Sequence, residues 1–158
     1  MVSLSEILDG RLVKLDVEAK SKDELLRSMT AWLVDAGLIS EQDKIKLDER
    51  IAERERLGAT CVGKEIAIPH SHLESLKTPL MGFARLKEPI DFGEPDHSSV
   101  NMVLLLITPS GDTLLQLMAI SRICRVLRDD EFVADLRAAA SPQDVEAAFR
   151  AVEARHLG

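Results

Sequence analysis

The segment Ile66-Ala67-Ile68-Pro69-His70 decides how this chain is interpreted. Its apolar run is too short for a helix and predicts a buried strand, which we expect to end at Pro69 because proline has no N–H group for a neighbouring strand. His70 is then held at a rigid strand end. Histidine is both a neutral nucleophile and a proton carrier near pH 7, so His70 is the first candidate reactive residue. An ordinary turn histidine is the alternative.

Length and charge limit the number of domains and the kinds of partner that we expect. The chain has 158 residues and a formal net charge of −7. We expect one domain over residues 1–158, large enough to fold without disulfides or metal, and no cofactor. The acidic balance and the absence of tyrosine argue against a nucleic-acid partner.

Targeting signals and cysteine usage indicate the compartment. Residues 1–16 lack the basic and continuous apolar regions of a signal peptide, and no later segment is long and apolar enough for a membrane span. Cys61 and Cys124 form no C-x-x-C pair, which argues against a zinc site or a disulfide framework. We therefore expect a cytoplasmic protein with no direct membrane insertion.

Hydrophobic periodicity predicts alternating strands and helices. Helices are expected after the caps Ser21, Ser40, Asp112 and Ser141, the second of them peripheral and the third, around residues 112–127, deeply packed. Strands are expected at residues 11–15, 66–68, 80–86 and 101–108, the last of them central and covered on both faces. The pattern predicts an α/β fold in which a mixed β-sheet is flanked by helices on both faces, with reactive residues at strand ends.

Residues 54–70, which read Arg-Glu-Arg-Leu-Gly-Ala-Thr-Cys-Val-Gly-Lys-Glu-Ile-Ala-Ile-Pro-His, carry a resemblance. They resemble the signature of the fructose/mannitol-type (type 2) IIA domains of the bacterial sugar phosphotransferase system, which has Arg-Glu, Gly-Ser-Thr and Ile-Ala-Ile-Pro-His at the same spacing. The similarity extends from residues 4–15 to the helices around residues 127–137. It implies the mannitol-specific IIA-like fold, and a single domain of this length is most similar to the nitrogen-regulatory IIA branch.

The resemblance implies a phosphotransferase that works as a phosphohistidine carrier. His70 matches the residue that accepts phosphate from an HPr-like carrier protein and passes it to a downstream regulatory protein or to a sugar-specific IIB component. Arg54 matches a residue that approaches the phosphoryl group, where a planar guanidinium suits three oxygens. A backbone carbonyl near Pro69 is expected to fix the other ring nitrogen of His70. The hydroxyl of Thr60 either joins the site or supports the turn at Gly58.

Two positions depart from the family pattern. Many members carry a second active-site histidine on the first turn of the helix after the central strand, and Gln116 aligns there. Glutamine donates hydrogen bonds but cannot become cationic. His72 follows where the family has a small or basic residue. In an extended chain His72 would share a side with His70 at about 6 to 7 Å and serve as the substitute. We expect a turn instead, with His72 on the surface.

Other functions stay open at this point. A degenerate IIA domain would bind a regulatory partner without being phosphorylated, and a sugar-specific fructose or mannitol IIA component would serve transport. A metal site would combine His70 and His72 with His97 or an acid. A thiol enzyme would pair Cys61 with His70, although a buried, inert thiol is the usual outcome for such a residue.

Overall fold

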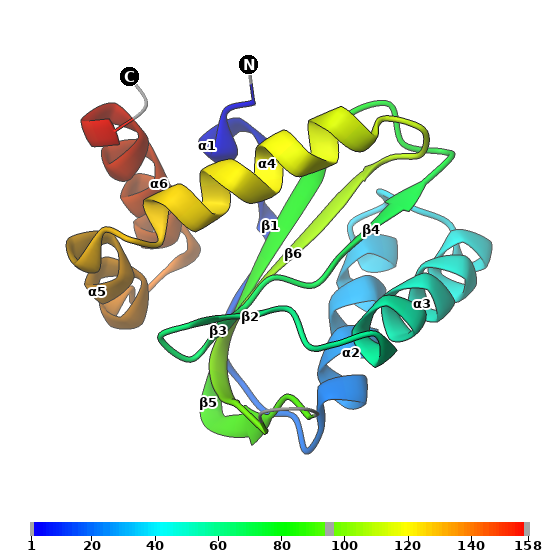
Figure 1. The fold of residues 1–158 in the computed structure, drawn as a ribbon, viewed down its shortest axis with the longest axis horizontal. Coiled ribbons are helices and arrows are strands. Elements are labelled where there is room, and N and C mark those ends of the chain that lie inside the picture. The colour runs from blue at the N-terminus through cyan, green and yellow to red at the C-terminus, as the bar shows by residue number, and fades with distance from the viewer. Residues whose placement is uncertain (1, 94–96, 157–158) are drawn as a thin grey trace.

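A mixed sheet of six strands forms the centre of the computed structural model, which describes residues 2–93 and 97–156 (Figure 1). The strands are β1 (Leu8–Val17), β2 (Cys61–Gly63), β3 (Ile66–Ala67), β4 (His70–Leu73), β5 (Leu80–Asp91) and β6 (Ser99–Pro109). The main order is β1-β5-β6-β3-β2, and β4 pairs with β6 beyond the end of β3. β5 and β6 run antiparallel, whereas β3 and β4 run parallel to β6.

Helices cover both faces of this sheet (Figure 1). They are α1 (Leu4–Ile7), α2 (Lys22–Asp35), α3 (Glu41–Arg56), α4 (Thr113–Val126), α5 (Asp130–Ala138) and α6 (Pro142–His156). The central strand β6 shows the division. Met102, Leu104 and Leu106 join the core with α4, α5 and α6. The alternate residues 103, 105 and 107 join the core with α2 and α3. The predicted α/β class and the doubly covered central strand are both confirmed.

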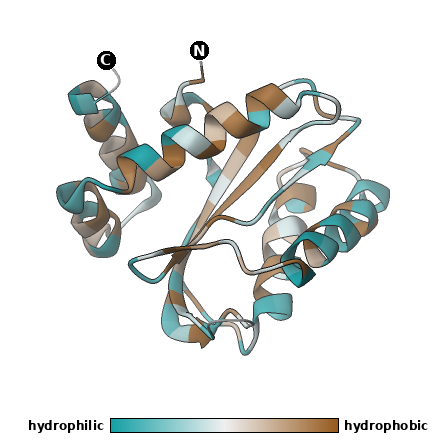
Figure 2. Cartoon of the chain, in the orientation of Figure 1, coloured by the Kyte–Doolittle hydropathy of each residue, from teal (hydrophilic) through white to brown (hydrophobic). Residues whose placement is uncertain are grey.

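Local sequence signals account for the helix starts. The side chains of Ser21, Ser40 and Asp112 accept hydrogen bonds from the backbone N–H three residues on, at 3.0 to 3.1 Å. Each satisfies an N–H group that the helix itself leaves unpaired, a contribution of about 1 kcal/mol per cap. α3 is largely hydrophilic in Figure 2 and buries only Leu47, Ile51 and Glu55, so the expected peripheral helix is confirmed.

The expectation of a deeply packed helix at residues 112–127 is wrong for half of α4. Its buried residues are Ala119, Ile123 and Val126. Leu114 and Leu117 near its start are 68% and 59% exposed. Leu114, Leu117 and Met118, which contributed to the apolar pattern of the helix, therefore form exposed surface on its first half. No helix of the described residues has the length and apolar character to cross a membrane.

The strand before Pro69 also behaves differently from the prediction. β3 ends at Ala67, but the chain does not leave the sheet after Pro69, because His70 begins the new strand β4. The carbonyl of Pro69 accepts a hydrogen bond from Leu106 N at 3.0 Å, so proline keeps its one usable backbone group in the sheet. The register then continues from His70 opposite Leu106 to Leu73 opposite Pro109. His70 is the first residue of a strand rather than the residue after one.

Candidate functional site

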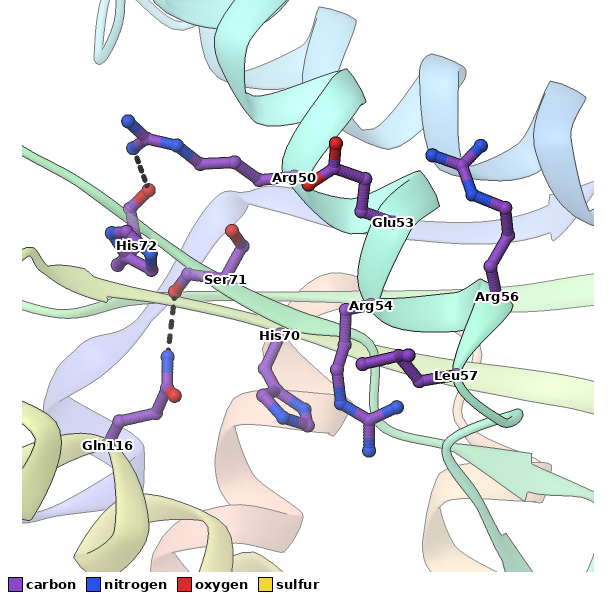
Figure 3. Close-up of a pocket in the computed structure, with 9 residues that line it drawn as sticks. All are labelled: Arg50, Glu53, Arg54, Arg56, Leu57, His70, Ser71, His72 and Gln116. Atoms are coloured by element: carbon purple, nitrogen blue, oxygen red, sulfur yellow. Dashed lines mark hydrogen bonds between the residues drawn. The ribbon is translucent and has the colours of Figure 1, made fainter.

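An open pocket of about 620 Å³ lies between α3, β4 and the first turn of α4 (Figure 3). It brings together the four residues that the sequence nominates, which are Arg54, His70, His72 and Gln116. Thr60 is not among the lining residues. The other residues around the pocket are Arg50, Glu53, Arg56, Leu57 and Ser71.

His70 is half-buried at the start of β4, and its ring is oriented by the backbone. Its Nδ1 lies 2.9 Å from the carbonyl oxygen of Ile68. A carbonyl only accepts, so in the neutral ring Nδ1 carries the hydrogen and Nε2 keeps its lone pair. The expected backbone acceptor is therefore present, two residues before the histidine. The arrangement leaves one nucleophilic nitrogen.

Arg54 reaches the same pocket from the last turn of α3. Its Nη1 donates to the carbonyl oxygen of Gly58 at 2.9 Å, which orients a guanidinium that carries five N–H donors in all. Figure 3 shows the guanidinium beside the imidazole of His70. A planar cation next to a nucleophilic nitrogen is suited to an anion with several oxygens.

Glu55 and Thr60 support the segment that carries Arg54. The hydroxyl of Thr60 donates to Oε2 of Glu55 at 2.7 Å, and Nζ of Lys22 lies 2.7 Å from Oε1 of the same carboxylate. The single hydrogen of the Thr60 hydroxyl is used in this buried contact. Of the two uses foreseen for its hydroxyl, the structure supports the structural one, with Glu55 rather than the turn at Gly58 as the partner.

Gln116 lies in the first turn of α4, as the alignment predicts, and it contacts the strand that holds His70. Its Nε2 donates to the carbonyl oxygen of Ser71 at 2.9 Å and to Oγ1 of Thr108 at 3.1 Å. Because the Ser71 carbonyl only accepts, the amide nitrogen must face it, and both amide hydrogens are engaged. The remaining polar atom, Oε1, is an acceptor.

His72 occupies an extended strand position, so the turn that we expected after His70 is wrong. The cause is the parallel pairing of β4 with β6, in which His72 lies opposite Thr108. The side chain is exposed, and its Nδ1 is 2.6 Å from the hydroxyl of Ser110. The extended alternative, with His70 and His72 lining one pocket, is the observed geometry. Whether His72 has a chemical role stays a prediction.

The sequence interpretation missed Arg50, although a signal was available. Arg50 lies one helical turn before Arg54, and residues four apart share a helix face. Arg50, Arg54 and Arg56 outnumber the acidic Glu53 around the pocket. The pocket therefore has a local positive balance in a chain whose net charge is −7. Such a balance favours an anionic reactant.

The metal and thiol alternatives find no support around His70. His97 lies against Oδ2 of Asp91 at 2.9 Å and does not line the pocket. Cys61 borders a different pocket, which is lined by residues of β2, β3 and the start of β6. In residues 2–93 and 97–156, no three His, Cys, Asp or Glu side chains are grouped to hold a metal ion.

Comparisons with known proteins agree with the fold. A nitrogen regulatory protein from Bradyrhizobium diazoefficiens is 36% identical over 129 residues, which cover 82% of each chain. The crystal structure of the nitrogen regulatory protein IIA-Ntr from Neisseria meningitidis matches with a TM-score of 0.81 at 27% identity, covering 92% of this chain and 98% of that one. Enzyme IIAMtl of Escherichia coli, solved in complex with phosphorylated enzyme IIBMtl, matches with a TM-score of 0.71 at 19% identity, covering 90% and 96%, and shows the fold alone.

The family comparison spans almost the whole chain. The family described as "Phosphoenolpyruvate-dependent sugar phosphotransferase system, EIIA 2" matches residues 6–152. This range contains every strand of the sheet and all four candidate site residues. The chain therefore belongs to the type-2 EIIA family of the phosphoenolpyruvate-dependent sugar phosphotransferase system.

Proposed function

We propose that this protein is a phosphoryl carrier, with Nε2 of His70 as the acceptor. The observation that carries the proposal is the contact between His70 Nδ1 and the Ile68 carbonyl, which in the neutral ring leaves the lone pair on Nε2, in the pocket that Arg54 also lines. The donor is an HPr-like phosphocarrier protein that bears its own phosphohistidine. The family of this chain, a phosphotransferase family, supports that chemistry.

The transfer balances without an added reactant. The lone pair of His70 Nε2 forms a bond to phosphorus as the P–N bond of the donor phosphohistidine breaks, and the donor imidazole keeps the released electron pair. Because both species are phosphoramidates, little driving force is needed, and the protein contributes alignment and charge stabilisation. Arg54 neutralises the phosphoryl oxygens during this step. The hydrogen remains on Nδ1 and stays hydrogen-bonded to the Ile68 carbonyl. This hydrogen bond stabilises the ring as it becomes positively charged.

The surroundings of the pocket support a protein donor rather than a small substrate. Leu57, which lines the pocket, is 85% exposed. Leu114, Leu117 and Met118 are exposed on the first half of α4, which also carries Gln116. Exposed apolar side chains beside a charged centre are typical of surfaces that dock another protein. The carrier would bury these residues when it brings its phosphohistidine to His70.

The downstream partner is proposed to be a regulatory protein. The support is the 36% identity to a nitrogen regulatory protein over most of both chains. A sugar-specific IIB component is the second candidate, because the related enzyme IIAMtl was solved with phosphorylated enzyme IIBMtl. We place the exchange in the cytoplasm, since a carrier protein and a regulator meet there. A gene neighbourhood with a membrane sugar permease would favour transport over regulation.

Phosphorylation in a defined system tests the proposal. The protein is incubated with phosphoenolpyruvate, the general phosphotransferase enzyme and a cognate phosphocarrier protein, and intact masses are recorded. We expect one added phosphoryl group that is acid-labile and base-stable, and none in His70→Ala. A wild-type protein that stays unmodified would remove the carrier function. It would leave a degenerate IIA domain that acts by binding, the alternative that the glutamine at position 116 favours.

A further inference from the structure

β4, the strand that begins with His70, is held from two sides through successive carbonyl groups. From α4, Gln116 donates to the carbonyl of Ser71 at 2.9 Å. From α3, Nη1 of Arg50 donates to the carbonyl of His72 at 2.9 Å. Figure 3 shows both contacts. β4 has four residues, and among the described strands its partner is β6. So short a strand has few ladder bonds of its own, and these two donors matter for its position.

Glu74, just beyond β4, fixes the direction of Arg50. Its two carboxylate oxygens lie 2.6 and 3.0 Å from the Arg50 guanidinium, a bidentate geometry. The hydrogen bond from Arg50 lowers the pKa of Glu74 to about 2, so the carboxylate is charged throughout the neutral pH range. The Arg50 guanidinium is therefore engaged by Glu74 and by the His72 carbonyl, whereas that of Arg54 donates to the Gly58 carbonyl.

Arg50 and Arg54 are one turn apart on α3, so their Cα atoms are separated by about 6 Å along one rigid helix. Arg50 contacts the strand that starts at His70, and Arg54 extends beside the ring of His70 (Figure 3). The hydrogen bond from Arg50 to the His72 carbonyl therefore joins α3 to β4. It fixes the distance between Arg54 on the helix and His70 on the strand.

We propose that Arg50, oriented by Glu74, is a positioning residue that sets the distance between Arg54 and His70 through its bond to the His72 carbonyl. The inference rests on the proposed function, since the distance matters for phosphoryl transfer. It gives Arg50 no contact with the phosphoryl group. A misplacement of about 1 Å between reacting groups lowers rates by up to roughly a hundredfold, which sets the scale of the expected effect.

The test compares Arg50→Met with Lys46→Met in single-turnover phosphorylation from the phosphorylated carrier. Lys46 lies one turn before Arg50 on α3, is exposed and does not line the pocket. Both variants lose one positive charge and keep an aliphatic stem. We expect Arg50→Met to lower the limiting rate about tenfold or more, and Lys46→Met to keep the wild-type limiting rate. Equal limiting rates in the two variants would overturn the inference.

Glu74→Gln separates positioning from a direct charge effect. If Arg50 stabilised the phosphoryl group by its charge, removal of the competing carboxylate would speed transfer. If Arg50 positions β4, loss of its bidentate partner slows transfer, and that is the expected result. Glu74 is exposed, so this variant should fold even where Arg50→Met does not. A faster Glu74→Gln protein would contradict the proposal.

An NMR measurement tests whether Arg50 positions β4, without any phosphorylation. In ¹⁵N-edited spectra of the His70 imidazole, the wild-type and Lys46→Met proteins should show one sharp set of ring signals, and Arg50→Met should show broadened or doubled ones. Unchanged signals in Arg50→Met would contradict a positioning role for Arg50. If the wild-type protein accepts no phosphate at all, the proposed function fails, whereas these spectra still decide whether Arg50 positions the histidine.

Discussion

Thr60 donates its hydroxyl hydrogen to Oε2 of Glu55 across 2.7 Å, in a buried contact behind the pocket. Lys22, from the start of α2, approaches the other oxygen of the same carboxylate at 2.7 Å. The two contacts fasten the end of α3 to α2 and to the segment that leads into β2. Since Arg54 precedes Glu55 in α3, the buried carboxylate helps to hold the helix end from which Arg54 extends.

Thr60→Val should destabilise the protein by about 1 to 3 kcal/mol, because it removes a donor from a buried carboxylate at nearly constant volume. Urea unfolding measures the change, and Thr60→Ser, which keeps the hydroxyl, is the control. Under conditions where Thr60→Val is fully folded, phosphorylation of His70 should proceed near the wild-type rate. A folded Thr60→Val protein with strongly reduced transfer would show that the hydroxyl acts on the phosphoryl group after all.

Arg54→Lys should slow phosphorylation of His70 and leave folding nearly unchanged. Lysine keeps the positive charge and can still donate to Gly58, but it lacks the planar fork that matches several phosphate oxygens. We expect a stability change of no more than about 0.5 kcal/mol for this half-exposed position. Rapid-quench phosphorylation and thermal melting give the two values. Wild-type kinetics would show that transfer does not depend on the planar fork of Arg54.

Asp129 offers a pH-dependent prediction away from the pocket. His156 Nε2 lies 2.6 Å from its Oδ2, Arg155 donates to the same oxygen, and Phe132 N donates to Oδ1. These contacts, that of His156 first, hold the pKa of Asp129 well below its ordinary value of 3.8. Because the folded pKa is the lower one, the carboxylate stabilises the fold above its ordinary pKa, and this contribution is lost as the pH falls toward the folded pKa.

Asp129→Asn should therefore lower the melting temperature at pH 7, since asparagine still caps α5 but carries no negative charge to pair with Arg155. The difference from the wild-type protein should shrink as the pH falls below about 4. Asp135→Asn, an exposed change on the same helix, serves as the control. A difference that is independent of pH between 7 and 3 would exclude the ionic contribution.

Local signals and the motif predicted most of the architecture. The caps at Ser21, Ser40 and Asp112 need only neighbouring residues, and the continuous apolar run of β6 marks a strand buried on both faces. The motif predicted that Arg54 and His70 share one site, and both residues line the same pocket. These features are encoded within a few residues or within a fixed pattern, so the sequence is sufficient to predict them.

Features that depend on distant pairing were not predictable. The continuation of the chain as β4 after Pro69 follows from the register with β6, more than thirty residues later in the chain. The Arg50 contact requires knowledge of which strand lies beside α3. Leu114 and Leu117 have the periodicity of buried residues, and only the placement of α4 relative to the sheet shows that they are exposed. Hydrophobic periodicity identifies an apolar side of a helix but not what covers it.

Gln116 and His72 compete for the role of the second histidine that many family members carry. Both amide hydrogens of Gln116 are engaged by Ser71 and Thr108, so its donation to a phosphoryl group requires one of these bonds to break. The His72 ring lies on the same pocket and contacts Ser110. Single substitutions at the two positions show which side chain acts on the phosphoryl group.

If the Gln116 amide acts on the phosphoryl group, Gln116→Ala should remove about 1.5 to 3 kcal/mol of charge-assisted hydrogen bonding and slow transfer roughly tenfold or more. Gln116→His should then restore a site with two histidines, and His72→Ala should be nearly silent. Single-turnover rates at saturating carrier measure all three. The reverse pattern, a silent Gln116→Ala and a damaging His72→Ala, would assign the role to His72. In that case neither the Gln116 amide nor its bond to Ser71 is required for transfer, and the partner of His70 comes from its own strand.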